Sequence, residues 1–185
     1  MDPTNKKIAD FLSLLNKRTI EPIDADIKIK ESCTATLLLI FAVIDSLSKI
    51  TCTDVEYTQF SHKRGNKVRF TNFLENLMGH SYGKFRDRLY DLRNDIVHTG
   101  INTKVILSKD KHAYHLKEVD GGLWINTCQF LDDLKETVKQ IRQNIEARGT
   151  YFQNAANRLQ EFNIIDVDQS PIPSPSPGPD DVPFQ

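Results

Sequence analysis

The chain has 185 residues, of which 39 % are hydrophobic, and a formal net charge of −1 at pH 7. This length and composition suit one packed domain with an appendage, and the near-zero charge excludes a global positive field that would by itself attract a polyanion. Three cysteines without a C-x-x-C pair predict neither a disulfide framework nor a zinc site, and they are typical of a cytoplasmic protein.

The first fifty residues predict two helices. Apolar residues at helical spacing, beginning with Ile8, predict an amphipathic helix that starts near Thr4. The segment R-T-I-E-P-I-D-A-D then predicts a connector. Residues 23–50 predict a long helix whose middle, T-A-T-L-L-L-I-F-A-V-I, is apolar on nearly every side, as in the centre of a bundle or at a subunit interface. A buried strand would also suit this segment, but the length favours a helix. The apolar run is too short to cross a bilayer, so we expect no membrane association.

The next segment alternates between polar and helical patterns. Residues 51–66 are polar and predict a loop, and a third helix is expected to end near Gly79. H-S-Y-G is expected to bridge it to a helix at residues 85–100. K-V-I-L-S and H-A-Y-H-L then predict a hairpin, and D-G-G followed by L-W-I predicts a turn and a third strand. These strands form a predicted β insertion at about residues 101–125.

Helical spacing returns after the insertion. Asn126 or Thr127 can cap the next helix, which Gly149 interrupts before a final helical segment. The Pro/Ser-rich residues 166–185 predict a disordered acidic tail. The predicted fold class is therefore all-α: a helical bundle over residues 1–165 with a small β-hairpin insertion, followed by the tail.

The stretch F-R-D-R-L-Y-D-L-R-N-D-I-V-H-T-G at residues 85–100 carries the candidate site. Its apolar residues recur at steps of four, three and four and predict one buried face. Asn94 lies on the opposite face, His98 follows only about 40° away, and Arg93 lies at the edge of the apolar stripe. The helix therefore brings an arginine, a carboxamide and an imidazole to one exposed patch. A simpler interpretation stays open, because the helix dipole favours a histidine in the last turn and an edge arginine can extend its charge to solvent.

Positive charge gathers around this stretch. Eight Lys or Arg residues lie between residues 63 and 98, against four acidic residues, whereas the last twenty residues hold four aspartates and no basic residue. Lys84, Arg86 and Arg88 are the candidate RNA-binding residues within this region. A solvated helix face with no partner explains such a pattern equally well.

The segment L-Y-D-L-R-N-D-I-V-H-T-G resembles the signature of HEPN domains, which are helical bundles with an R-x-x-x-x-H motif that often begins Arg-Asn. Asp45-x-x-x-Lys49 on the preceding long helix resembles a weaker acidic-x-x-x-Lys pattern of that family. An i,i+4 surface ion pair is the alternative explanation for these two residues. Many HEPN proteins are metal-independent endoribonucleases that dimerise through the motif helix.

The resemblance implies a toxin or defence effector that cleaves RNA and leaves 2′,3′-cyclic phosphates. His98 would be the acid/base residue, Arg93 would bind the scissile phosphate, Asn94 would orient or hydrogen-bond, and Asp45 and Lys49 would support the site. No metal or cofactor is expected, and the implied partners are RNA, a second copy of the chain, and an antitoxin or regulatory protein. These residue types suit the reaction, because RNA supplies its own 2′-hydroxyl nucleophile and imidazole exchanges protons near neutral pH.

Two other functions remain open from the sequence. A non-catalytic dimerisation or RNA-binding module would use the motif helix only as an interface, and the near-neutral charge favours this alternative because nonspecific RNA binding normally needs a basic face. A small-ligand-binding bundle is the third candidate, although no specific residue set identifies it.

Overall fold

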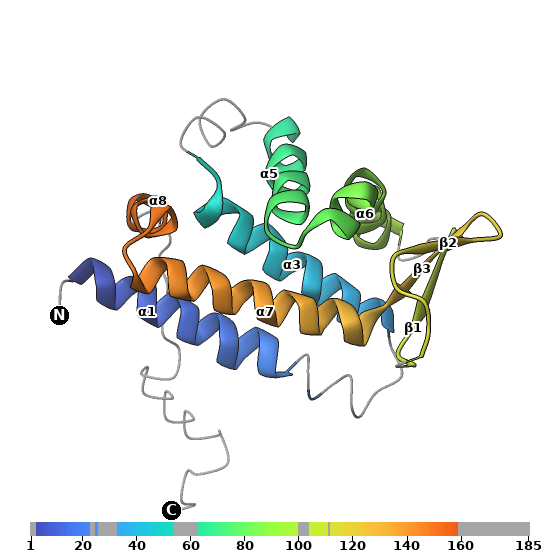
Figure 1. Ribbon diagram of the computed structural model, residues 1–185, viewed down its shortest axis with the longest axis horizontal. Helices are drawn as coiled ribbons and strands as arrows, with labels where there is room; N and C mark the ends of the chain where they lie inside the picture. The colour runs from blue at the N-terminus through green and yellow to red at the C-terminus, as the bar shows by residue number, and fades with distance from the viewer. Residues whose placement is uncertain are drawn as a thin grey trace, which may run out of the picture.

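The computed structural model describes residues 3–22, 25, 33–53, 63–99, 104–110 and 112–158. The fold is mainly α-helical with a small sheet between two of the helices, which confirms the predicted class (Figure 1). The helices are α1 (Pro3–Leu15), α3 (Cys33–Thr51), α5 (Lys63–Asn76), α6 (His80–Thr99), α7 (Thr127–Glu146) and α8 (Thr150–Arg158), and the strands are β1 (Val105–Ser108), β2 (Lys117–Val119) and β3 (Gly122–Asn126).

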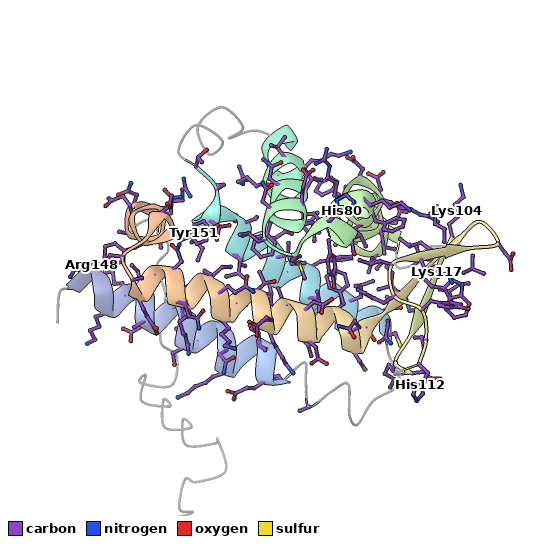
Figure 2. The ribbon with its side chains drawn as sticks, viewed as in Figure 1. His80, Lys104, His112, Lys117, Arg148 and Tyr151 are labelled. Atoms are coloured by element: carbon purple, nitrogen blue, oxygen red, sulfur yellow. The ribbon has the colours of Figure 1, made fainter. Side chains whose placement is uncertain are left out.

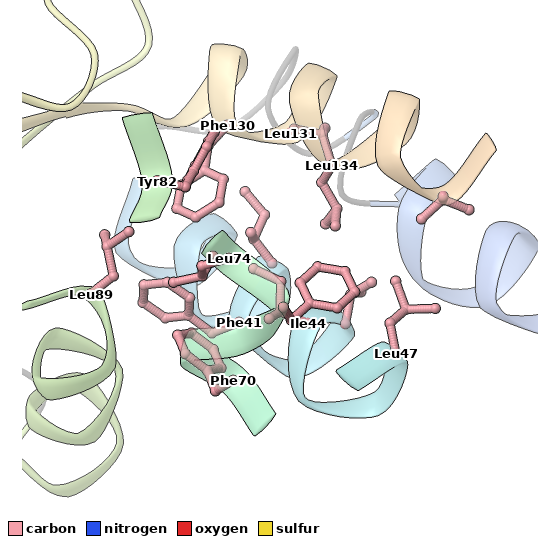
Figure 3. Packing of buried hydrophobic residues seen from close by; sticks show 14 of the residues in the cluster. Phe41, Ile44, Leu47, Phe70, Leu74, Tyr82, Leu89, Phe130, Leu131 and Leu134 are labelled. Atoms are coloured by element: carbon pink, nitrogen blue, oxygen red, sulfur yellow. The ribbon is translucent and has the colours of Figure 1, made fainter. Parts of the chain in front are cut away.

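Helix α3 occupies the centre of the core, as its apolar sequence predicts. It contacts α5, α6, α7 and α8. Phe41 of α3 makes edge contacts with Phe70 of α5 and Phe130 of α7, with ring centroids 5.7 and 5.9 Å apart (Figure 3). All three rings are fully buried, and each such side chain contributes about 1.5–3 kcal/mol through removal of its apolar surface from water.

By length and composition α3 could cross a bilayer, since an 18-residue window within it has a mean hydropathy of 1.7. This corrects the expectation that its apolar segment is too short. Half of that window is nevertheless buried inside the bundle, and the core helix of a soluble protein meets the same criterion. Burial of Phe41 and its neighbours explains the apolar sequence without a membrane.

The chain after α1 stays helical where a connector was predicted. Residues Asn16–Ile20 form the π-helix η1, in which the Glu21 N–H donates to the Asn16 carbonyl five residues earlier. Ile20 is only 3 % exposed. The wider turn of a π-helix lets the chain continue as a helix and still bury this side chain. The predicted start of the long helix before Cys33 lies largely outside the described residues.

Helices α5 and α6 begin earlier than the sequence suggests. Residues 63–66 belong to α5 and not to a loop, and H-S-Y-G forms the first turn of α6 and not a bridge. Gly79, with φ of +97°, makes the corner, and its carbonyl accepts the N–H groups of Tyr82 and Gly83. A Cβ on Gly83 would lie 3.2 Å from Glu75 Cγ. Gly83 therefore permits close packing of the two helices.

The sheet has the order β1-β3-β2, and its topology differs from the predicted hairpin. Residues 112–116 form no strand, and β1 pairs with β3 in parallel. The hairpin instead joins β2 and β3 through Asp120 and Gly121, both at positive φ. Two consecutive positive φ values match a type I′ turn, for which Asp-Gly is a preferred sequence.

The predicted boundaries of α7 are confirmed. The side chain of Asn126 accepts the N–H groups of Cys128 and Gln129, which caps the helix, and the chain leaves the helix before Gly149. Helix α8 then returns to the core, where the buried Arg158 donates to the carbonyls of Lys49 and Cys52 at the end of α3. The predicted tail at 166–185 lies outside the described residues.

Candidate functional site

Helix α6 buries the predicted apolar stripe and turns the motif outward. Phe85, Leu89, Leu92 and Ile96 are at most 7 % exposed, while Asn94 is half-buried and His98 is exposed in the last turn. The step from Asn94 to His98 is one helical turn, so the carboxamide and the imidazole share the outer side of the helix. The sequence pattern therefore predicted the orientation of this helix correctly.

Arg93 joins α6 to α3 through Asp45. Its Nε and Nη2 atoms donate to Asp45 Oδ2 over 3.1 and 2.6 Å, and its Nη1 donates to Asn94 Oδ1 over 2.9 Å. The two ion-paired side chains are 23 % and 25 % exposed, so water screens the pair only partly. Three of the five residues to which the family resemblance gives a catalytic or supporting role thus lie in direct contact, and Asp45 has a cationic partner on another helix.

These bonds fix the guanidinium without using all its donors. Arginine carries five N–H groups in a planar fork, and the three bonds to Asp45 and Asn94 use one on Nε, one on Nη1 and one on Nη2. Among the described residues, the second N–H group of each terminal nitrogen has no hydrogen-bond acceptor. Because the fork is held from two sides, it can present these donors to an anion with little loss of side-chain entropy.

The remaining predicted residue of α3, Lys49, lies one turn after Asp45 and is half-buried. Its backbone carbonyl accepts a hydrogen bond of 2.6 Å from Arg158 Nη1. The backbone of Lys49 therefore contacts α8.

The candidate RNA-binding residues make contacts within the chain. Arg86 pairs with Glu75, and the Lys84 ammonium lies 5.0 Å from the ring centroid of Phe85. Arg88 Nη1 donates to Glu118 over 2.5 Å, and its Nη2 donates to the Lys104 carbonyl over 3.1 Å. Arg88 thus ties α6 to the β insertion. Partner carboxylates also offset part of the positive charge that the sequence places in this region.

The helices α3 and α6, which carry the ion pair, also expose apolar side chains. Leu38 and Leu39 of α3 and Val97 of α6 are 36 %, 39 % and 50 % exposed. Leu38 lies on the same stripe of α3 as Asp45, about two turns earlier, and Val97 follows Arg93 by one turn.

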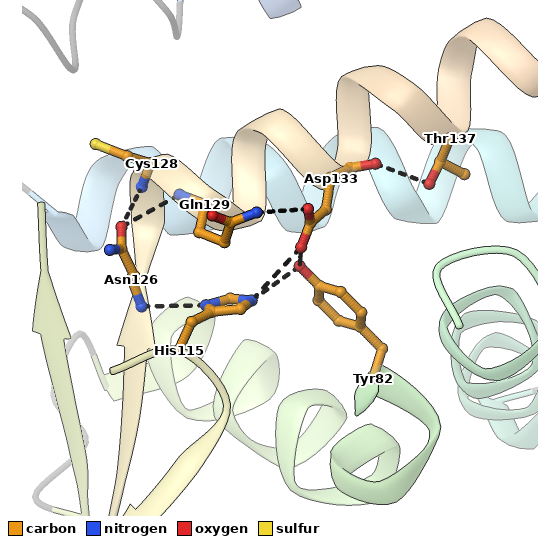
Figure 4. Close-up of polar contacts among 7 residues, drawn as sticks. All are labelled: Tyr82, His115, Asn126, Cys128, Gln129, Asp133 and Thr137. Atoms are coloured by element: carbon orange, nitrogen blue, oxygen red, sulfur yellow. Dashed lines mark hydrogen bonds and ion pairs between the residues drawn. The ribbon is translucent and has the colours of Figure 1, made fainter. Parts of the chain in front are cut away.

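The structure also contains a polar network that the sequence did not reveal (Figure 4). The Tyr82 hydroxyl donates to Asp133 Oδ2 over 2.7 Å and lies 2.9 Å from His115 Nε2. His115 Nδ1 accepts the backbone N–H of Asn126 over 3.2 Å, and Gln129 Nε2 donates to Asp133 Oδ1 over 2.7 Å. The network connects α6, the β insertion and α7.

This network fixes the proton on the histidine. Because Nδ1 accepts from a backbone N–H, the neutral imidazole carries its proton on Nε2 and donates it to the Tyr82 oxygen. Burial lowers the pKa of His115, although the Asp133 carboxylate and the Asn126 N–H act in the opposite direction. Burial, together with the bond to Asp133, raises the pKa of Tyr82 far above its ordinary value. Both groups are therefore neutral near pH 7.

Sequence reasoning had no signal for these residues. His115 lies in the segment H-A-Y-H-L, which was predicted as a strand, and its partners Tyr82 and Asp133 are far from it in the sequence. Within the described residues no group of three or more His, Cys, Asp or Glu side chains is arranged to hold a metal ion.

No family model, curated protein or solved structure matches this chain.

Proposed function

We propose that the chain is a metal-independent endoribonuclease of HEPN type that acts in the cytoplasm as a toxin or defence effector. The observation that carries the proposal is the guanidinium of Arg93, which Asp45 of α3 and Asn94 of α6 hold in place. Arg93 lies on the same helix, α6, that exposes His98. A fixed cation and an accessible imidazole are the groups that a transesterification of RNA requires.

Each residue has a definite task in the proposed reaction. The free N–H groups of Arg93 bind the non-bridging oxygens of the scissile phosphate and stabilise the charge that develops on the phosphorane. His98 takes the proton from the 2′-hydroxyl or gives one to the leaving 5′-oxygen. Asp45 positions the Arg93 guanidinium, and Asn94 accepts a hydrogen bond from its Nη1 atom. The products are a 2′,3′-cyclic phosphate and a free 5′-hydroxyl.

The proposal includes a homodimer. One motif supplies a single imidazole, whereas the reaction needs a base and an acid, so a two-fold pair of motif helices would supply both groups. The exposed Leu38 and Leu39 of α3 and Val97 of α6 are apolar surface on the two helices that the ion pair joins, and a second copy of the chain could cover them. An antitoxin or regulatory protein could bind the same surface.

The test is cleavage of total RNA in EDTA by the wild type and by His98→Ala and Arg93→Ala variants. We expect each variant to lose at least about a hundredfold in rate, the range of general acid–base and charge-stabilising groups. His80→Ala is the matched control for His98, since His80 is an exposed histidine at the start of the same helix (Figure 2). Arg142→Ala, at an exposed arginine of α7, is the control for Arg93. Wild-type cleavage by His98→Ala would reject the mechanism.

The second candidate is a non-catalytic dimerisation or RNA-binding module. The pairing of Arg93 with Asp45 and of Arg88 with Glu118 favours it, because both pairs reduce the positive charge available to RNA. A well-folded wild-type dimer that cleaves no RNA would favour this candidate.

A further inference from the structure

A pocket of about 310 Å³ lies where the middle of α1 meets the end of α7 and the start of α8. In Figure 2, Arg148 marks this end of the bundle, opposite to the end that carries Lys117 of the β insertion. The volume is at the lower limit of the range of about 300–1,000 Å³ for small-molecule sites. Among the described residues that line the pocket, none belongs to the motif helix α6.

The inner wall of the pocket is apolar. Ile8 and Leu12 of α1 and Ile145 of α7 line it and are at most 5 % exposed. Phe152 of α8 is half-buried beside them, and the exposed Ala9 of α1 takes up little room. Such a wall favours hydrocarbon over water, because burial of apolar surface lowers the free energy. The pocket can therefore hold an apolar chain.

Three charged side chains also line the pocket, namely Arg142 and Glu146 of α7 and Arg148 just after that helix. All three are exposed, and within the described part of the chain none of them forms an ion pair or a side-chain hydrogen bond. Two guanidinium groups and one carboxylate give the lining one net positive charge. This charge suits a ligand that carries a single negative charge.

Arg148 is the arginine whose position is best defined. It has φ of +54°, the left-handed conformation that usually belongs to glycine after a helix, and its N–H donates to the Ile145 carbonyl over 3.0 Å. The central carbon of its guanidinium lies 5.8 Å from the ring centroid of Phe152. The ring contact keeps the guanidinium at the pocket wall, and its N–H groups have no acceptor among the described residues.

We propose that this pocket binds a medium-chain carboxylate, such as a fatty acid. The hydrocarbon chain packs against Ile8, Leu12 and Phe152, and the carboxylate accepts hydrogen bonds from Arg148. A planar guanidinium matches the two coplanar oxygens of a carboxylate, and the single charge of that group balances the net charge of the lining. A phosphate monoester carries about −1.5 to −2, which Glu146 in the same lining disfavours. The site is separate from the proposed ribonuclease centre and does not depend on it.

The test is titration of the isotope-labelled full chain with decanoate below its micelle concentration, followed by NMR and by calorimetry. We expect saturable shifts at residues 8–12 and 142–152, and about fourfold tighter binding for each methylene added between hexanoate and decanoate. Acetate has the head group alone, and decyltrimethylammonium has the chain with the opposite charge, so both should bind much more weakly. Equal binding of either compound, shifts at other residues, or no binding of decanoate would overturn the proposal.

Two other occupants of the pocket would give different results. Binding to phosphatidylglycerol vesicles without binding of decanoate would identify a membrane surface. Nuclear Overhauser contacts between the pocket methyl groups and residues 159–185 in the ligand-free chain would show that the chain itself fills the pocket. Either outcome would overturn the proposal.

Variants of opposite charge effect test the head-group contact. Arg148→Gln should weaken decanoate binding at least about fivefold, because it removes the cation that pairs with the carboxylate. Glu146→Gln should tighten binding, because it removes a negative charge from the lining. Lys7→Gln is the control and should bind as the wild type does, since Lys7 is exposed on α1 outside the pocket lining. A change in the same direction in Arg148→Gln and Glu146→Gln would contradict the assigned contact.

A steric pair tests the place of the hydrocarbon chain. Ala9→Phe fills the pocket from an exposed position of α1 and should abolish decanoate binding. Ala147→Phe is the matched control, because Ala147 is also exposed but lies outside the lining. Circular dichroism checks the fold of each variant. Wild-type affinity in a folded Ala9→Phe would refute the site.

Discussion

The contact between Arg93 and Asp45 is the residue-scale feature on which the candidate site depends. It joins two residues that are 48 positions apart in the sequence. Asp45 therefore makes a tertiary contact with α6 in place of the i,i+4 surface pair with Lys49 that was the alternative from the sequence. Both side chains are about one quarter exposed. The contact should therefore be stronger than an ordinary surface pair.

A double-mutant cycle with Asp45→Asn and Arg93→Gln measures this contact. We expect a coupling free energy of about 0.5–3 kcal/mol from chemical denaturation, as for residues in direct contact within a charged network. The control cycle, Lys67→Gln with Asp87→Asn, removes a pair whose side chains are 42 % and 65 % exposed, and its coupling should stay below about 1 kcal/mol. Equal coupling in the two cycles would show that the Arg93 pair has no special strength.

The His115 network predicts a pH dependence of folding stability. Burial lowers the folded-state pKa of His115 below the ordinary 6.5, so the unfolded chain binds more protons in the interval between the two values. The contribution of His115 to the free energy of unfolding should be fully present above about pH 6.5. It should be lost as the pH falls toward the folded-state pKa. Protonation of Nδ1 would also break the bond from the Asn126 N–H.

Denaturation between pH 5 and 7.5 tests this prediction with two variants. His115→Gln should flatten the curve over this interval, whereas His112→Gln should keep the wild-type slope, because His112 is exposed. The groups that face His115 are Tyr82, which is neutral, and the carboxylate of Asp133. If the free energy of unfolding of His115→Gln changed with pH as steeply as that of the wild type, the pH dependence would come from other groups.

At the scale of elements, the β insertion depends on its turn. The sequence D-G-G was recognised as a turn, but it closes the β2–β3 hairpin, while β1 joins the sheet in parallel. A parallel strand has no local sequence signal, because its partner is set by the path of the chain between the two strands. Arg88 of α6 then holds the turn through Glu118 and the Gly121 carbonyl.

Substitution of adjacent glycines tests the turn. Gly121→Ala places a side chain at φ of +77° and should destabilise the protein by about 1–2 kcal/mol. Gly122→Ala is the control, because its Cβ would meet Ile106 Cδ1 at 3.4 Å, an ordinary contact, without positive φ. Both variants are measured by urea unfolding. A larger loss in Gly122→Ala would contradict the assignment of strain to Gly121.

At the scale of the whole molecule, the central question is which surface meets another copy. Leu38 and Val97 are exposed on α3 and α6, the two helices that the Arg93–Asp45 pair joins and that the proposed composite site would use. Single substitutions there should change assembly without harm to the core, because neither side chain is buried.

Leu38→Glu and Val97→Glu should each convert the expected dimer to a monomer, since an unpaired carboxylate would be desolvated at the interface. Light scattering measures the mass, and circular dichroism confirms the fold. Ile106→Glu on β1 is the control, because Ile106 is 42 % exposed on another element and should leave the mass unchanged. A monomeric wild type would remove the basis for the composite site.

The sequence by itself determined the mainly helical class, the central place of α3, the outward face of the motif helix and the cap of α7. These features follow from local chemistry: the spacing of apolar residues and the preference of Asn126 for a helix start. The tertiary structure alone decided the Arg93–Asp45 contact, the Tyr82–His115–Asp133 network, the parallel β1–β3 pair and the early start of α6. The first three of these features join residues that are distant in the sequence, and the early start of α6 depends on close packing against α5 at Gly83. Such contacts are set by the packing of the folded core and not by neighbouring residues along the chain.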